Sequence, residues 1–338
     1  MESLFGSGSA LAWGVFTAFV LVMLVLDLAV FHRRSHEISL REATAWTIAW
    51  IALACVFGAG VWVLEGSKAG VEFFTAYVIE KSLSVDNIFV FLVIFSYFRV
   101  PLKYQHRVLF WGIFGALVMR AIFIFAGAAL LREFEWVMYI FGAFLVFTAL
   151  KLALAGDEKF EPENSRMYKL YCKVVPTTRE FHEEHFVVRE NGALRATPLL
   201  ACLLLIETTD VIFALDSIPA VFGVTLDTFI VYTSNIFAIL GLRALYFVVG
   251  GVVDKFRYLD VGLAIVLGFV GLKMLLKDFL HVPVGISLLI VVGVLGASMV
   301  ASVWKTRREE KEEAAADDVP LAGPQGPKVP GPEDDRHW

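Results

Sequence analysis

Carboxylates, amides and hydroxyls occur together in two stretches of this chain whose flanks are strongly apolar. The first stretch is EKSLSVDN, at residues 80–87, and the second is ETTDVIFALDS, at residues 207–217. Oxygen ligands of this kind suit hard divalent cations such as Mn²⁺, Mg²⁺ or Ca²⁺, whereas Zn, Cu and Ni sites normally recruit His or Cys. The predicted ligands of such a cation are Glu80, Asp86, Asn87, Glu207, Asp210 and Asp216.

Helical geometry separates the two acids that lie six residues apart in each stretch. Successive residues of an α-helix are about 100° apart around its axis, so Glu80 and Asp86 point about 120° apart. Asp210 and Asp216 have the same spacing. A regular helix would not direct both acids of a pair at one point. The sequence therefore predicts local unwinding, which Pro219 favours because proline lacks a backbone N–H.

The composition of the whole chain is that of a polytopic membrane protein. Of its 338 residues, 58% are hydrophobic and 19% are charged, with a mean hydropathy of +0.71, which lies outside the balance of soluble chains. The formal net charge of −5 argues against nucleic acid as a partner. The cysteines, Cys55, Cys172 and Cys202, form no CxxC pair and favour neither disulfides nor thiolate metal sites. The predicted fold class is all-α, with the lipid bilayer as solvent.

Nine apolar stretches are long enough to cross a bilayer, which takes roughly 20 residues of helix. They lie at about 9–31, 43–64, 70–98, 108–131, 135–155, 198–222, 228–250, 259–279 and 283–304. The loops on one side of the membrane carry 21 Lys and Arg residues and those on the other carry 3. The positive-inside rule therefore places the N-terminus outside and the C-terminus in the cytoplasm. The expected parts are a transmembrane domain (1–304) that includes a cytoplasmic loop (156–197), and a disordered tail (305–338).

Five basic residues fall inside the expected spans: Lys81, Arg120, Lys151, Arg243 and Lys273. Ionised side chains at the centre of a bilayer cost at least about 2.5–3.5 kcal/mol on insertion scales, so they are rare and usually functional. A guanidinium cannot coordinate a cation, and we expect Arg120 and Arg243, together with Lys81, to form ion pairs that orient the acids. Two alternatives stay open: an ion-pair network that binds no ion, and a proton relay through the same carboxylates.

The third to fifth expected helices resemble the sixth to eighth. The acids at 80 and 86 match those at 210 and 216, MRAIFIFAG around Arg120 matches LRALYFVVG around Arg243, and TALKLAL around Lys151 matches VGLKMLL around Lys273. Each copy, about 70–155 and about 198–279, contains three helices, so the second must be inverted. Inverted repeats with ion sites between them are typical of secondary transporters. The alternative is chance similarity of apolar strings, which the matched order of acid, Arg and Lys disfavours.

The remaining polar residues carry weaker signals. Asp27 and Glu72 are expected near membrane interfaces, and HEEH places His182 and His185 at i and i+3, where a solvated turn is favoured over a regulatory metal site. The chain has no GxxxxGK[ST] motif, so it contains no ATP-binding site of that kind. Acids spaced six apart do not form a protease dyad either, and no enzymatic activity is predicted.

Two strings carry a family resemblance, EKSLSVDNIFVF (80–91) and ETTDVIFALDSIPA (207–220), supported by LDLAVFHRRSHEIS and FRYLDVGLAIVLGFVGLKML. Across about residues 15–300 the chain resembles the TerC/Alx family of integral membrane proteins. The resemblance implies a relation to the LysE-like transporter superfamily, a link with tellurium resistance, and manganese export. It implies that the metal-related acids are Glu80, Asp86, Glu207, Asp210 and Asp216, with Asn87 as a candidate. Carboxylates would repel tellurite, so the link with tellurium is expected to be indirect.

Together, the residues and the resemblance predict a Mn²⁺ exporter of the bacterial cytoplasmic (inner) membrane. It would work by alternating access, with proton exchange as the driving reaction and no cofactor besides the ion that it moves. Mn²⁺, Mg²⁺ and Ca²⁺ differ mainly in radius and in the rigidity that they demand, so the identity of the ion rests on the resemblance. The alternative, from another functional class, is a membrane-embedded partner-binding or metallation factor without net transport.

Overall fold

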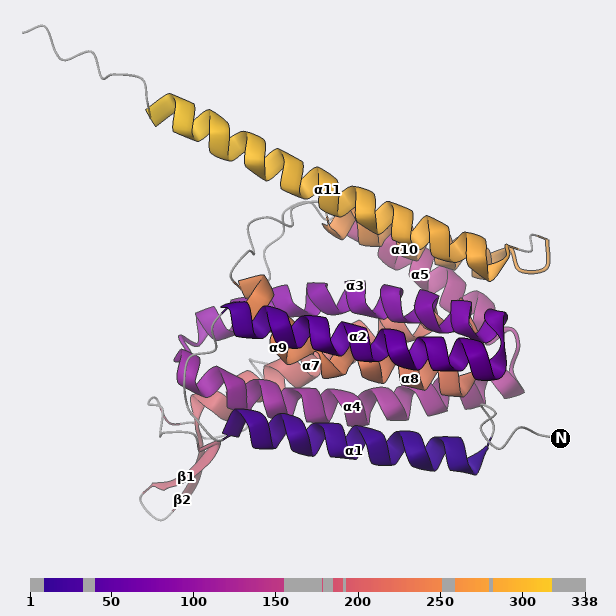
Figure 1. Ribbon diagram of the computed structural model, residues 1–338. Helices are drawn as coiled ribbons and strands as arrows, with labels where there is room; N and C mark the ends of the chain where they lie inside the picture. The colour runs from indigo at the N-terminus through magenta and orange to yellow at the C-terminus, as the bar shows by residue number, and fades with distance from the viewer. Residues whose placement is uncertain are drawn as a thin grey trace, which may run out of the picture.

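A computed structural model shows the chain as a bundle of long helices, most of which run along one common direction (Figure 1). The structure describes residues 9–32, 40–154, 178, 185–190, 193–250, 259–279 and 282–317. The helices are α1 (Ala10–His32), α2 (Leu40–Glu65), α3 (Ser67–Tyr97), α4 (Leu102–Glu133), α5 (Val137–Leu154), α7 (Pro198–Phe222), α8 (Thr228–Leu240), α9 (Leu242–Gly250), α10 (Leu259–Leu275) and α11 (Val284–Asp317). Each predicted span coincides with one helix, except that the seventh is divided into α8 and α9.

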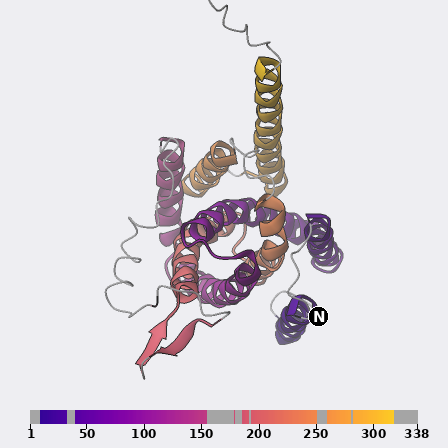
Figure 2. The same ribbon diagram turned by 90° about the vertical axis from the view of Figure 1, so that its left-hand side faces the viewer.

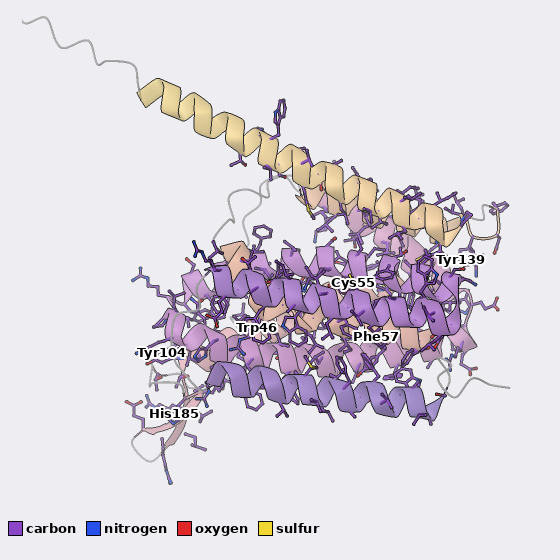
Figure 3. The ribbon with its side chains drawn as sticks, viewed as in Figure 1. Trp46, Cys55, Phe57, Tyr104, Tyr139 and His185 are labelled. Atoms are coloured by element: carbon purple, nitrogen blue, oxygen red, sulfur yellow. The ribbon has the colours of Figure 1, made fainter. Side chains whose placement is uncertain are left out.

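A short β-hairpin marks one end of the bundle. Its strands, β1 (Val187–Glu190) and β2 (Ala193–Ala196), pair antiparallel, with Val187 opposite Ala196 and Glu190 opposite Ala193. We call this the hairpin end, where Tyr104 and His185 also lie (Figure 3). The other end, called the turn end, carries the α2–α3 turn, the α7–α8 loop and the α10–α11 connection, and Tyr139 lies there.

The lengths and compositions of the helices fit a membrane-spanning protein. Among the described residues, five helices are long and apolar enough to cross a membrane: α2, α4, α5, α7 and the 284–306 part of α11. The α8–α9 pair adds a sixth if it counts as one bent span. α3 falls outside this count because it carries Glu72, Glu80, Lys81 and Asp86. Large apolar side chains cover the outside of the bundle, which suits contact with lipid. The all-α polytopic membrane fold is confirmed.

Four helices form the centre of the molecule. α3 packs against α7 and α8, and α4 packs against the same two helices; Figure 2 shows this group end-on, with α5, α10 and α11 on one side and α1 and α2 on another. Aromatic rings join α1 and α2 to the centre. The ring of Phe57 lies 5.4 Å from Phe16, 5.4 Å from Phe73 and 4.9 Å from Phe237, measured between centroids.

The packing has the pattern of two inverted copies, α3–α4–α5 and α7–α8/α9–α10. α3 begins at the turn end and α7 at the hairpin end, and the first helix of each copy packs against the second helix of the other. The third helices, α5 and α10, pack against each other. A Cβ atom on Gly142 would lie 3.0 Å from the Gly271 carbonyl oxygen, and one on Gly271 would lie 2.8 Å from the Gly142 carbonyl oxygen. Small residues allow such close approach of helices in membranes.

The structure differs from the sequence expectations in two elements. α3 and α7 are continuous, and Pro219 lies within the last turn of α7, so the predicted unwinding at the acids is absent from these described helices. The break lies instead between Leu240 and Leu242, where α8 and α9 bend by 44° around Gly241. In addition, α11 continues to Asp317, past the expected start of the disordered tail at 305. The extension is rich in Arg, Glu, Lys and Ala, which are strong helix formers.

Candidate functional site

Arg120 of α4 lies at the centre of a buried polar cluster to which four helices contribute. Its Nη1 donates to Glu80 Oε2 of α3 at 2.5 Å and to Asn235 Oδ1 of α8 at 3.1 Å, and its Nη2 donates to Asp210 Oδ1 of α7 at 3.4 Å. Asn235 Nδ2 also donates to Glu80 Oε1 at 2.6 Å. These four side chains are at most 2% exposed. The cluster is therefore a desolvated ion-pair network in the middle of the helix bundle.

Helical spacing explains how α3 and α7 build the cluster from opposite sides. Glu80 and Asn87 are seven residues apart on one face of α3, and Asp210 and Ser217 have the same spacing on α7. Asn87 Nδ2 donates to Asp210 Oδ1 at 3.4 Å, and Arg120 Nη1 donates to Ser217 Oγ at 3.5 Å. The first acid of each pair spaced six apart, Glu80 and Asp210, thus joins the cluster without any unwinding.

Some buried oxygens on α3 and α7 have no hydrogen-bond partner in the part of the chain that the structure describes. Asn87 Oδ1, Asp210 Oδ2 and Ser84 Oγ are buried and lack a hydrogen-bond partner among the described residues. Leaving a buried polar atom unsatisfied costs about 1–3 kcal/mol, and amide and carboxylate oxygens are ligands of hard cations. The part of the chain that the structure describes contains no group of three His, Cys, Asp or Glu side chains placed to hold a metal. Any cation at the cluster would need ligands of mixed type.

The second acid of α7 faces a different neighbour. Asp216 Oδ1 accepts a hydrogen bond from Thr148 Oγ1 of α5 at 3.0 Å. A cavity of about 250 Å³ connects this pair to the central cluster, and its polar lining consists of Asn87, Arg120, Thr148, Lys151, Asp216 and Ser217. The 120° separation of the acids is therefore preserved in α7. The side chain of Asp86, the matching acid of α3, lies outside the described residues.

The other predicted site residues do not join the central cluster through the contacts that the structure describes. The carboxylate of Glu207 lies against Gly115 of α4, where a Cβ atom would overlap it. Lys81, expected to pair with the acids, instead donates to the carbonyl oxygen of Ala238 at 3.2 Å, at the end of α8. The break after α8 leaves this carbonyl available, and a lysine stabilises the C-terminus of a helix. Arg243 is buried in α9, just beyond the break.

The weaker candidates lie at the periphery. Glu72 of α3 is buried near the turn end, where it accepts a hydrogen bond from Thr225 at 2.7 Å and lies 3.8 Å from the ammonium of Lys68. His185 is exposed, and its carbonyl oxygen accepts from Thr197. His182 and the side chain of Asp27 lie outside the described residues.

Sequence reasoning missed two contributors to the polar sites, Asn235 and Thr148. Asn235 had a usable signal, because an amide inside the apolar run VYTSNIFAIL is as unusual in a span as a charge is. Thr148 had none, since a threonine can satisfy its hydroxyl on its own helix.

The fold and its buried charges define a multi-pass integral membrane protein, and comparisons with known proteins agree. The chain belongs to the integral membrane protein TerC family, whose model matches residues 65–310. An uncharacterised membrane protein of Myxococcus xanthus is 53% identical over 319 residues, covering 94% of this chain and 100% of the relative. Alx of Escherichia coli K12, named as a proposed membrane-bound redox modulator, is 46% identical over 314 residues. The match covers 90% of this chain and 98% of the relative. No solved structure matches the chain.

Proposed function

We propose that this protein exports a divalent cation, Mn²⁺, by alternating access around the central cluster. The observation that carries the proposal is a pair of buried oxygens, Asn87 Oδ1 and Asp210 Oδ2, which have no hydrogen-bond partner among the described residues and lie at the interface of two inverted helix triplets. Buried acceptors without donors in a membrane favour a function that uses them. Inverted triplets around such a site are the architecture of secondary transporters.

The distances within the cluster favour Asp210 as the carboxylate that exchanges partners. Arg120 lies 2.5 Å from Glu80 but 3.4 Å from Asp210, so Glu80 is held more tightly. The two carboxylates and one guanidinium leave one negative charge, which attracts a cation. An arriving ion would bind the free oxygens of Asp210 and Asn87 first, with Ser84 and Ser217 nearby as hydroxyl donors. Carboxylate, amide and hydroxyl oxygens together suit Mg²⁺, Ca²⁺ and Mn²⁺, and Mn²⁺ is chosen on the family resemblance.

We propose an orientation in the bacterial inner membrane, and the direction of transport, export, is taken from the family resemblance. The positive-inside rule assigns the hairpin end and the C-terminus to the cytoplasm and the turn end to the outside. Proton exchange is the proposed driving reaction.

The test is metal flux in proteoliposomes that contain the wild type, Asp210→Asn or Asp216→Asn, with Mn²⁺, Ca²⁺ and Mg²⁺ each offered across an imposed pH gradient. We expect Mn²⁺ flux in the wild type and its loss in both variants. Glu190→Gln is the matched control, because Glu190 forms its ion pair with Arg195 in the hairpin, and it should transport normally. Mn²⁺ binding without flux would favour a metallation factor. Absence of flux for every cation in folded wild type would refute transport.

A further inference from the structure

Two separate cavities, one against the central cluster and one nearer the turn end, are each lined by one of the two lysines that match between the repeats. The cavity of about 250 Å³ contains Lys151 of α5 together with Asp216. A second cavity, of about 760 Å³, contains Lys273 of α10 together with Glu72. Neither lysine takes part in the ion pairs around Arg120 that the structure describes. The central cluster therefore leaves both of them unexplained.

The two cavities lie at different depths along the bundle. The larger one is at the turn end, since its lining includes Lys68 beside the α2–α3 turn, Thr225 of the α7–α8 loop and Asp278 after α10. Asp278 accepts a hydrogen bond from Tyr139, which Figure 3 places at that end. The smaller cavity reaches from Asn87 and Ser217 at the cluster toward Leu152, close to the C-terminus of α5 at the hairpin end.

The two cavities share one set of residues drawn from both repeats: a carboxylate, a threonine and a lysine. The larger cavity adds further charged residues, namely Glu65, Lys68, Asp227, Lys277 and Asp278. In the smaller one, the Asp216 carboxylate of the second copy accepts from Thr148 of the first, 3.0 Å away. In the larger one, the Glu72 carboxylate of the first copy accepts from Thr225 of the second, 2.7 Å away. A lysine of the third helix completes each set. Asn87 Oδ1, buried and without a partner among the described residues, lines the smaller cavity and continues it into the cluster.

We propose that the two cavities are half-channels that lead the ion to and from the central cluster, and that Lys151 and Lys273 gate them. Each ammonium acts as a tethered cation that offsets the charge of the carboxylate matched to it, Asp216 or Glu72, when no transported ion is there. A divalent ion and an ammonium repel each other strongly at close range in a medium of low dielectric constant. Entry of the ion therefore requires withdrawal of the lysine, and return of the lysine expels the ion.

Withdrawal has a defined destination for Lys273. Its Nζ donates to Ser287 Oγ of α11 at 3.1 Å, and Ser287 is buried, so the ammonium is bound to a neutral acceptor, while Glu72 accepts from Thr225 and lies near Lys68. Lys151 is exposed on α5 and is able to turn toward the polar boundary of the bilayer, as lysines near helix ends do. The two gates therefore move without rearrangement of the central ion pairs.

The inference rests on the proposed function. Its test measures Mn²⁺ flux in membrane vesicles prepared in each of the two orientations. The variants are Lys151→Met, Lys273→Met and the control Lys103→Met. Lys103 lies over the Tyr104 ring at the hairpin end, outside both cavities. We expect Lys151→Met to lower the half-saturating Mn²⁺ concentration at least about tenfold only when the ion is offered at the hairpin end. Lys273→Met should lower the half-saturating Mn²⁺ concentration only when the ion is offered at the turn end. Lys103→Met should leave it unchanged at both ends.

Unchanged saturation in both variants, with wild-type transport intact, would overturn the gates and leave the proposed function standing. A second measurement is independent of transport. In a cysteine-free background, Thr148→Cys should react with a charged, membrane-impermeant thiol reagent from the hairpin end only, and Thr225→Cys from the turn end only. Reaction from the opposite side, or no reaction at either position, would overturn the half-channels even if the wild type moves no cation.

Discussion

At the scale of single residues, Arg120 determines how the four central helices meet. Its guanidinium donates to carboxylates on α3 and α7 and to an amide on α8. Arginine provides five donors in a planar arrangement that no other side chain reproduces. Removing it would leave Glu80 and Asp210 as unpaired buried charges.

We therefore expect Arg120→Met to destabilise the protein by about 3–5 kcal/mol, the usual cost of breaking a buried pair by removing one partner. Arg120→Lys should rescue it only partly, because one ammonium cannot reproduce the fork geometry. Unfolding in detergent micelles by heat or SDS measures the effect. Arg132→Met is the control, since Arg132 donates to Thr228 near the turn end and is exposed. Equal stability of Arg120→Met and Arg132→Met would contradict the central role of Arg120.

Asn235 is the second residue of the central cluster whose hydrogen bonds can be tested by substitution. Asn235→Ala removes the donor to Glu80 Oε1 and the acceptor for Arg120, and the loss should cost about 1–3 kcal/mol in the same unfolding measurement. Ser234→Ala is a closely matched control, because Ser234 is equally buried and, among the described residues, its hydroxyl donates to the carbonyl oxygen of Val231 in its own helix. A similar loss in both variants would show that the loss does not depend on the bonds to Glu80 and Arg120.

The residues of the polar clusters were predictable in part. Glu80, Asp210 and Arg120 stood out because charged side chains inside apolar runs are costly. The partner of Lys81 could not be predicted, because it depends on a break after α8 that exposes the Ala238 carbonyl. Asp216 contacts Thr148 rather than the cluster because regular helical geometry points it about 120° away from Asp210. The prediction of unwinding was wrong because it assumed that all the acids converge on one point.

At the scale of elements, α5 and α10 join the two copies by close packing of their backbones at Gly142 and Gly271. We expect Gly142→Leu to force these helices apart, because even a Cβ atom would contact the backbone of Gly271. Overpacking of this kind typically costs about 1–3 kcal/mol. Gly60→Leu on α2 is the control, since nothing lies within 4 Å of a Cβ at that position. Thermal unfolding of the purified variants in detergent compares them, and an unaffected Gly142→Leu would argue against close packing of the third helices.

The helices themselves were predictable because their lengths are set by bilayer thickness, so that apolar runs of roughly 20 residues mark them. Their ends were less so. The extension of α11 to Asp317 lies beyond the apolar run and depends on helix-forming polar residues. The division of α8 from α9 has only Gly241 as a local signal, and it depends on Trp50 and Lys81, which lie 3.1 and 3.0 Å from where a Cβ of Gly241 would be.

At the scale of the whole molecule, the two triplets are inverted relative to each other. The two ends of the bundle therefore carry different residues but are built from corresponding helices. The order of acid, arginine and lysine in the sequence predicted this relation. The two copies interlock, since α3 contacts α8 and α4 contacts α7. Each polar cavity accordingly takes its carboxylate from one copy and its threonine from the other. A pattern within one copy could not reveal these pairs, since they form only on assembly.

The orientation of this inverted assembly in the membrane is testable without any transport measurement. Leu194 in the hairpin and Leu226 in the α7–α8 loop are exposed at opposite ends of the bundle. Because basic residues concentrate in the loops at the hairpin end, we expect a membrane-impermeant maleimide to label Leu226→Cys in intact spheroplasts, and Leu194→Cys only after permeabilisation. The chain without either substitution gives the background from its native cysteines. The reverse labelling pattern would mean that the bundle has the opposite orientation in the membrane. Lys273 and Glu72 would then face the cytoplasm, and the smaller cavity would be the outer half-channel. Labelling of both positions in intact spheroplasts would contradict the crossing of the membrane by α7, which lies between them.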